Sequence, residues 1–171
     1  MNAMTDKARD IFIVGLRNQH AVENQAIELL ERQVGRLENY PEMRDRMRTH
    51  IEESKQQAQR IEQILASLGT SHSAMKDMAM SLTGNLLAIG HSTATDEVVK
   101  NTFANYAFEH YEIASYKSLI ALADTLGYSG KSQLETSLGE EQRMAEWIDQ
   151  HIAATTRRYV ERAAAGQTAG V

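Results

Sequence analysis

Apolar residues recur every three or four positions along most of the chain. This spacing puts them on one side of a helix, so the pattern predicts an all-α protein. Thr5 is the expected N-cap of the first helix, and Pro41 suits the first turn of the second. Four long helices are predicted, at about 5–38, 41–69, 96–126 and from the end of GYSGKS (127–132) to about 163.

Two of the connections between these helices are short and one is long. The sequences NYP (39–41) and GYSGKS leave room only for tight turns, whereas about 25 residues separate the second helix from the third. Within that long connection, residues 74–89 predict a shorter amphipathic helix. Two helical hairpins joined by a long crossover form a known four-helix bundle topology. We therefore expect a single domain over residues 1–163 and a frayed tail at 164–171.

Composition limits the chemistry and the partners. The chain has no cysteine, so a bound metal would have oxygen and imidazole ligands. A net charge of −5 argues against nucleic acid as a partner, because phosphate affinity comes mainly from clustered Lys and Arg. The run IFIVGL (11–16) is too short to span a membrane or to form the core of a signal peptide. We expect a soluble, cytoplasmic protein without a membrane or nucleic-acid partner.

Polar residues interrupt the buried side of each predicted helix near its middle. At a rise of 1.5 Å per residue, Glu23 and Glu53 lie roughly 24 and 20 Å from the turn that joins their helices. Glu112 and Glu141 lie roughly 24 and 17 Å from theirs, so the polar positions of all four helices are expected near one level. These positions are Glu23 on the first helix, His50, Glu53 and Gln57 on the second, Glu109 and Glu112 on the third, and Glu141 on the fourth.

Acidic residues at these positions require a compensating charge. Carboxylates inside a bundle repel one another and lose hydration, which costs several kcal/mol per ion. Two divalent cations offset both effects, because they supply positive charge and bind carboxylate oxygens. The i, i+3 spacing of Glu109 and Glu112 directs both side chains to one place, and His50 and Glu53 repeat that spacing. The alternative is that these glutamates lie on solvated helix edges or pair with Lys and Arg.

Three stretches resemble a known family. PEMRDRMRTHIEESKQQAQRIEQILASLG, FEHYEIASYKSL and LGEEQ are similar to the YciE/YciF-type stress-response family of ferritin-like proteins, over about residues 8–155. The resemblance implies a ferritin-like four-helix bundle with a long crossover, a rubrerythrin-like dinuclear site for iron or manganese, and a homodimer. The metal ligands that it implies are Glu23, Glu53, Glu109, Glu112 and Glu141, with His50 and Gln57 as ligands or as their hydrogen-bond partners.

The chain also departs from the wider di-iron pattern, which has Glu-x-x-His on two helices. Met144 follows Glu141 at i+3, and Gln56 follows Glu53, so neither histidine is in its usual place. Ala145 occupies a position that is often acidic in the family. In RNQHAVENQ (17–25), His20 stands where the family usually has an aromatic residue, and it is a further candidate nitrogen ligand.

Each candidate has a purely structural alternative. Glu140 is as acidic as Glu141, and a helical phase error of one residue would exchange them. His20 and His110 are expected to be structural, and His72, His91 and His151 to be loop or surface residues. The tyrosines near the acidic positions are expected to pack in the core with satisfied hydroxyl groups.

Two functions from different classes follow. The leading hypothesis is a ferritin-like stress protein whose two metal ions, iron or manganese, react with oxygen or peroxide. The alternative is a metal-free or metal-stabilised helical protein that acts by association, as a homodimer. An iron-storage or DNA-protecting cage is disfavoured because the resemblance is to dimeric relatives and no basic arm is present.

Overall fold

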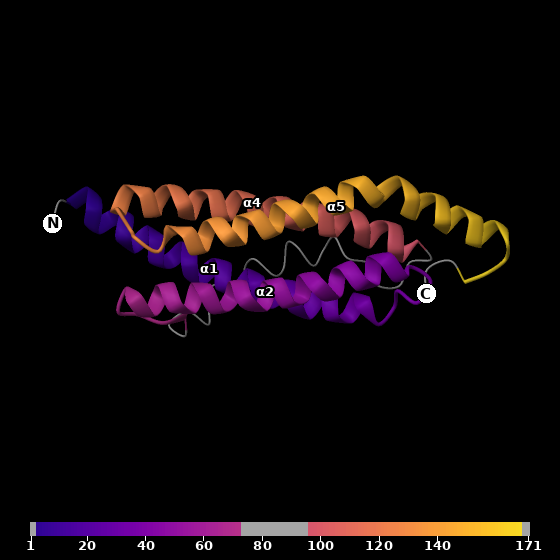
Figure 1. Cartoon of the computed structure of the whole chain (residues 1–171), viewed down its shortest axis with the longest axis horizontal. Helices are drawn as coiled ribbons and strands as arrows, with labels where there is room; N and C mark the ends of the chain where they lie inside the picture. Colours follow the sequence, from indigo (N-terminus) through magenta and orange to yellow (C-terminus); the bar gives the residue numbers. More distant parts are fainter. Residues whose placement is uncertain (1–2, 73–95, 169–171) are drawn as a thin grey trace.

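Four long helices form where the apolar spacing predicts them (Figure 1). The computed structural model describes residues 3–72 and 96–168, so the helix predicted at 74–89 lies outside the described residues. The all-α fold class is confirmed. The helices are α1 (Ala3–Val34), α2 (Pro41–Ser67), α4 (Glu97–Leu126) and α5 (Lys131–Ala164).

The ends of the helices differ from prediction at two places. The first helix begins at Ala3, so Thr5 lies inside it and is not its N-cap. It ends at Val34 rather than Glu38, because residues 35–40 form successive tight turns that lead into Pro41, the first residue of α2. At the other turns, Gly69 and Gly127 adopt positive φ angles of 73° and 61°, a conformation in which glycine avoids the steric cost of a Cβ.

The helices pack as a ring in which α1 contacts α2 and α4, and α5 also contacts α2 and α4. Helix α2 ends and α4 begins at opposite ends of the bundle (Figure 1). The two hairpins, α1–α2 and α4–α5, are therefore related as in a ferritin-like bundle with a long crossover, as predicted. No helix within residues 3–72 and 96–168 is long and apolar enough to cross a membrane.

The described core has two large apolar clusters separated along the bundle axis and a third, small one of Val22, Ala26 and Phe108. One large cluster surrounds Phe12, Ile61 and Leu119, and the other surrounds Leu30, Met47 and Ile148. Between these two lies a layer of polar side chains that are at most 2% exposed: Gln19, Glu23, His50, Ser54, Gln57, Asn105, Glu109, Glu112 and Glu141. The fold thus places the acidic residues in the middle of the molecule, with apolar packing on both sides.

Truncation of a core side chain should destabilise the bundle. Ile61 is fully buried, and Ile61→Ala is expected to lower the free energy of unfolding by roughly 2–5 kcal/mol, since it removes packing and leaves a cavity. Urea denaturation of the metal-free protein measures this loss. The control is Val160→Ala, at a side chain that is 57% exposed, where a change within about 0.5 kcal/mol is expected. Equal effects of the two variants would contradict this description of the core.

Candidate metal centre

One histidine and three glutamates meet at the centre of the bundle. His50 comes from α2, Glu109 and Glu112 from α4, and Glu141 from α5. One potential ligand atom from each of the four side chains lies within 4.8 Å of the others. These donors, an imidazole nitrogen and carboxylate oxygens, suit a divalent cation.

Helical geometry explains how these side chains meet. Glu109 and Glu112 lie one turn apart on the same face of α4, so both point into the bundle. On α5, Glu141 takes the inward position, while its neighbour Glu140 faces α2 and binds Arg60 through two contacts of 2.6 and 2.9 Å. The ambiguity between these two glutamates is thereby resolved, with Glu141 in the central group.

Glu23 lies beside this group and is tied to it by hydrogen bonds. The amide nitrogen of Gln19 donates to Oε1 of Glu23 at 2.9 Å and to Oε1 of Glu112 at 3.2 Å. The hydroxyl group of Tyr116 donates to the same oxygen of Glu23 at 2.5 Å. Gln19 and Tyr116 were not among the predicted site residues, although both occupy buried stripe positions that would have brought them to the same level.

His50 connects the centre of the bundle to its edge. Its Nε2 atom lies 3.2 Å from Glu109 and 3.6 Å from Glu141, and its Nδ1 atom lies 3.0 Å from Glu53. Glu53 is 21% exposed and also binds Arg46 at 3.1 Å. It therefore contacts the outer side of the His50 ring and lies outside the central group.

The inner carboxylates have few partners. Within the described residues, no Lys or Arg lies within 4 Å of a carboxylate oxygen of the central group or Glu23, and their only ion-pair contacts are with His50. Several buried donor and acceptor atoms also have no hydrogen-bond partner there. These atoms are Oε2 of Glu23, Glu109 and Glu112, both carboxylate oxygens of Glu141, and Nε2 of His50, whose contact with Glu109 does not have hydrogen-bond geometry.

Burial changes the acidity of these groups. Desolvation raises the pKa of Glu23 to about 7, against the opposing effect of the Tyr116 and Gln19 hydrogen bonds. Desolvation and repulsion from neighbouring carboxylates hold the pKa values of Glu112 and Glu141 well above the ordinary value. Burial disfavours a charged His50, but the surrounding carboxylates outweigh it and raise its pKa well above normal. Without cations, the centre therefore retains protons on buried groups.

A divalent cation fits this environment. Unpartnered buried oxygens need positive charge or a proton, and cations supply the charge without adding bulky side chains. The buried layer contains the predicted ligands Glu23, His50, Glu109, Glu112 and Glu141. Glu53 lies outside it and contacts the outer nitrogen of His50. His20, the further candidate nitrogen ligand, faces away from the centre and contacts Glu62 on α2. Gln57 donates to Glu140 rather than to a candidate ligand.

The sequence matches a family model that covers most of the chain. Residues 7–161 match a family described as a domain of unknown function, DUF892. The chain belongs to this family. Protein YciF of Escherichia coli strain K12 is 30% identical over 141 residues, which span 80% of this chain and 84% of YciF. The resemblance to YciE/YciF-type proteins is therefore confirmed.

Solved structures extend the relationship to the fold. A crystal structure of a protein from Xanthomonas campestris pv. campestris has a TM-score of 0.76 and 31% identity, and the match covers 91% of this chain and 98% of that one. The crystal structure of the E. coli stress protein YciF has a TM-score of 0.73 and covers 85% of this chain and 94% of YciF. Over that superposition the identity is 25%. This DUF892 chain thus shares the helical bundle of YciF over 85% of its length.

The metal-free protein should lose stability as pH rises. Glu23, Glu112, Glu141 and His50 all have raised pKa values, so above about pH 5 the folded state binds more protons than the unfolded state. The free energy of unfolding is therefore expected to fall between about pH 5 and pH 8, by roughly 3 kcal/mol from Glu23 alone. Chemical denaturation in the presence of a chelator measures this slope.

The Glu141→Gln variant provides the comparison for this experiment. It removes one buried carboxyl group with a raised pKa, so its stability should depend less on pH. Stability that increases from about pH 5 to pH 8 in the chelated wild-type protein would show that the inner carboxylates are not proton-bound.

Proposed function

We propose that the protein is a ferritin-like stress protein of the cytoplasm whose central residues bind two divalent metal ions, iron or manganese, that react with oxygen or peroxide. The observation that carries this proposal is the group of inner carboxylates without a Lys or Arg partner among the described residues. Desolvating carboxylates with neither a cation nor hydrogen bonds costs several kcal/mol per ion. Bound cations would offset this cost, so the arrangement is that of a cation-binding site.

The protein residues would have distinct tasks at this centre. Glu23, Glu109, Glu112 and Glu141 would supply oxygen ligands, and His50 would supply a nitrogen ligand through Nε2. Glu53 accepts a hydrogen bond from Nδ1 of His50, which fixes the ring with Nε2 directed at the centre. When bound, the metal ions would supply the electrons and open coordination positions that oxidant chemistry requires.

The neighbouring groups would control protons and water. Tyr116 donates its hydroxyl proton to Oε1 of Glu23, and Gln19 holds the same oxygen together with Oε1 of Glu112. Protons held by Glu23 and its neighbours near neutral pH would have to leave as cations bind, so binding should release protons. The apolar clusters on both sides exclude bulk water, which strengthens electrostatic interactions within the layer.

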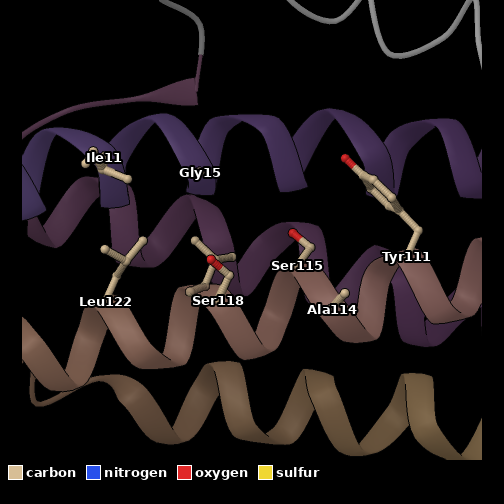
Figure 2. A pocket seen from close by; sticks show the side chains of 8 residues that line it. Ile11, Gly15, Tyr111, Ala114, Ser115, Ser118 and Leu122 are labelled. Atoms are coloured by element: carbon tan, nitrogen blue, oxygen red, sulfur yellow. The ribbon is translucent and has the colours of Figure 1, made fainter.

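A structural role as a homodimer is the second candidate, and an exposed groove favours it. The groove runs between α1 and α4, has a volume of about 250 Å³, and is lined by Ile11, Gly15, Tyr111, Ala114, Ser115, Ser118, Leu119 and Leu122 (Figure 2). At Gly15, the α1 backbone packs so closely on α4 that a Cβ would lie 2.9 Å from Cδ2 of Leu119, while Ile11 and Tyr111 are 49% and 37% exposed. A second copy packed on this face would bury these apolar side chains in a symmetric interface.

Metal content tests the leading function. Protein produced with iron or manganese is expected to contain about two metal ions per chain by elemental analysis, and to consume peroxide. Glu141→Gln should lose at least one ion and slow peroxide consumption roughly tenfold or more, since it replaces a ligand with a weaker neutral donor. Glu146→Gln, at an exposed position on the same helix, should behave as wild type. Wild-type protein that stays metal-free under these conditions would contradict the proposal and favour the structural role.

The size of the protein in solution tests the homodimer. Sedimentation analysis should give a dimer for the wild type, and Ile11→Glu should shift it to monomer by placing a charge in the apolar groove. Val160→Glu, at an exposed apolar residue of α5 outside the groove, should remain dimeric. A monomeric wild type would refute the homodimer, and a dimeric Ile11→Glu variant would place the interface elsewhere.

A further inference from the structure

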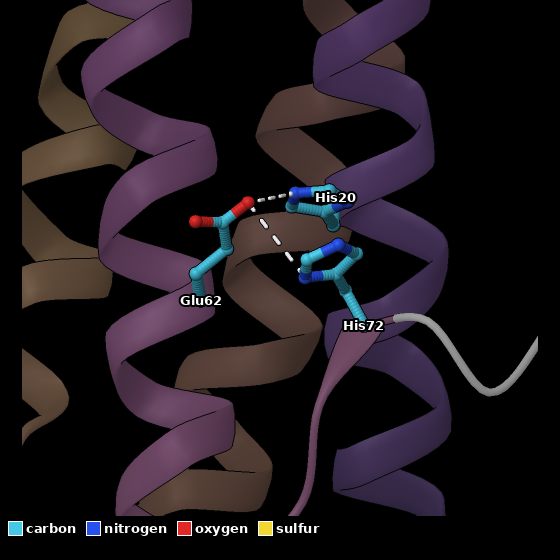
Figure 3. Close-up of side chains that lie close together, drawn as sticks. All are labelled: His20, Glu62 and His72. Atoms are coloured by element: carbon cyan, nitrogen blue, oxygen red, sulfur yellow. Dashed lines mark hydrogen bonds and ion pairs between the residues drawn. The ribbon is translucent and has the colours of Figure 1, made fainter.

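Three further potential metal ligands converge on the outer surface of the α1–α2 hairpin (Figure 3). Nε2 of His20 on α1 lies 2.9 Å from Oε1 of Glu62 on α2. Nδ1 of His72, which follows α2, lies 3.7 Å from the same oxygen. One potential ligand atom from each of the three side chains lies within 4.8 Å of the others. Three separate parts of the chain therefore bring two imidazoles and one carboxylate to a single point.

Neighbouring contacts hold this arrangement in place. The Arg17 guanidinium donates to the Ser71 carbonyl oxygen at 2.9 Å and to the Thr70 hydroxyl at 2.6 Å, which fixes the segment before His72 against α1. The His20 and His72 rings are stacked, with centroids 4.4 Å apart and an interplanar angle of 22°. These contacts reduce the ordering that a bound ligand would otherwise have to impose.

The other ring nitrogen of His20, Nδ1, contacts Asn24. The Asn24 side-chain amide lies 3.4 Å from Nδ1 of His20, and its nitrogen donates to the His20 carbonyl oxygen. With its nitrogen placed there, the amide can only donate to Nδ1, so the proton of the neutral ring lies on Nε2 and is directed at Glu62. A metal ion that binds Nε2 would replace this proton.

A simple ion pair does not account for the whole cluster. It explains the contact of His20 with Glu62, but His72 lies beyond hydrogen-bond distance from Glu62 and stacks on His20. Two protonated imidazoles stacked in this way would repel each other. Ligand atoms of a tetrahedral zinc ion, with bonds of about 2.0–2.1 Å, are roughly 3.3–3.4 Å apart. The two contacts to Glu62, at 2.9 and 3.7 Å, lie on either side of that spacing.

We propose that His20, Glu62 and His72 form a second, surface metal site that binds a divalent ion of the zinc type. Two nitrogen donors and one oxygen donor match the three-ligand zinc sites in which water occupies the fourth position. The side chains of Glu62 and His72 are 44% and 46% exposed, so an ion reaches them directly from solvent. This site is distinct from the central group, because none of its ligands belongs to that group.

Zinc titration of the full-length, metal-free protein tests the site. Calorimetry should detect a binding event in the wild type that His72→Ala and Glu62→Gln each weaken at least tenfold, while Glu141→Gln retains it. His110→Ala removes a different exposed histidine, on α4, and should bind zinc as the wild type does. If His72→Ala and Glu62→Gln both bind zinc with unchanged affinity and stoichiometry, the proposal is wrong.

Chemical modification locates the ion independently of affinity. Diethyl pyrocarbonate acylates neutral imidazole, and mass spectrometry identifies the modified residues. Zinc at saturating concentration should protect His72 at least tenfold and leave His110 reactive. Equal modification of His72 with and without zinc would overturn the proposal, even if calorimetry detects zinc elsewhere in the protein.

Discussion

Desolvation of the inner carboxylates is the constraint on which the rest of this structure depends. Four helices each contribute polar groups to one layer, and apolar clusters close it on both sides. In such a place a carboxylate remains ionised only if positive charge or hydrogen bonds replace the lost water. Gln19, Tyr116 and His50 provide part of this compensation, and protons or cations must provide the remainder.

The basic residues show that the layer is not simply a set of salt bridges. Arg60 binds Glu140, and Arg46 binds Glu53, so each arginine meets a carboxylate at the edge of the layer. A shift of α5 by one residue would put Glu140 inside and leave Arg60 without its partner. Breaking such a partly buried pair is costly, and the edge pairs therefore help to fix the register that keeps Glu141 at the centre.

Much of this arrangement was predictable from the sequence, because helical spacing alone determines which residues share a face. The four helices, and the level at which Glu23, Glu109 and Glu112 meet, follow from counting residues and from the rise per residue. The orientation of Glu53 did not follow. It lies three residues after His50. At about 100° per residue, three residues do not complete a full turn, so its side chain lies to one side of that of His50, at an edge position next to Arg46 rather than at the centre.

The His20 cluster was beyond sequence reasoning for a different reason. Neither hydrophobic periodicity nor spacing relates His20 to His72, since they lie 52 positions apart and one of them follows the end of a helix. The contact depends on the way residues 70–72 lie against α1, which Arg17 stabilises through side-chain hydrogen bonds. Such contacts depend on loop conformation, which periodic patterns do not encode.

The two groups of potential ligands differ in donor chemistry, and this difference has a consequence for metal selection. The central group offers mainly carboxylate oxygens and one imidazole, a set that suits hard or intermediate ions such as manganese and ferrous iron. The surface cluster offers two imidazoles and one carboxylate, a set that suits zinc.

Access to the two groups differs as well, because the central residues are almost fully buried while Glu62 and His72 face solvent. An ion at the centre would exchange only when the bundle opens, whereas an ion at the surface would exchange freely. A nitrogen-rich site on the surface would therefore take up zinc-type ions without requiring the core to open, and the oxygen-rich centre would favour the redox-active ions that its proposed chemistry needs.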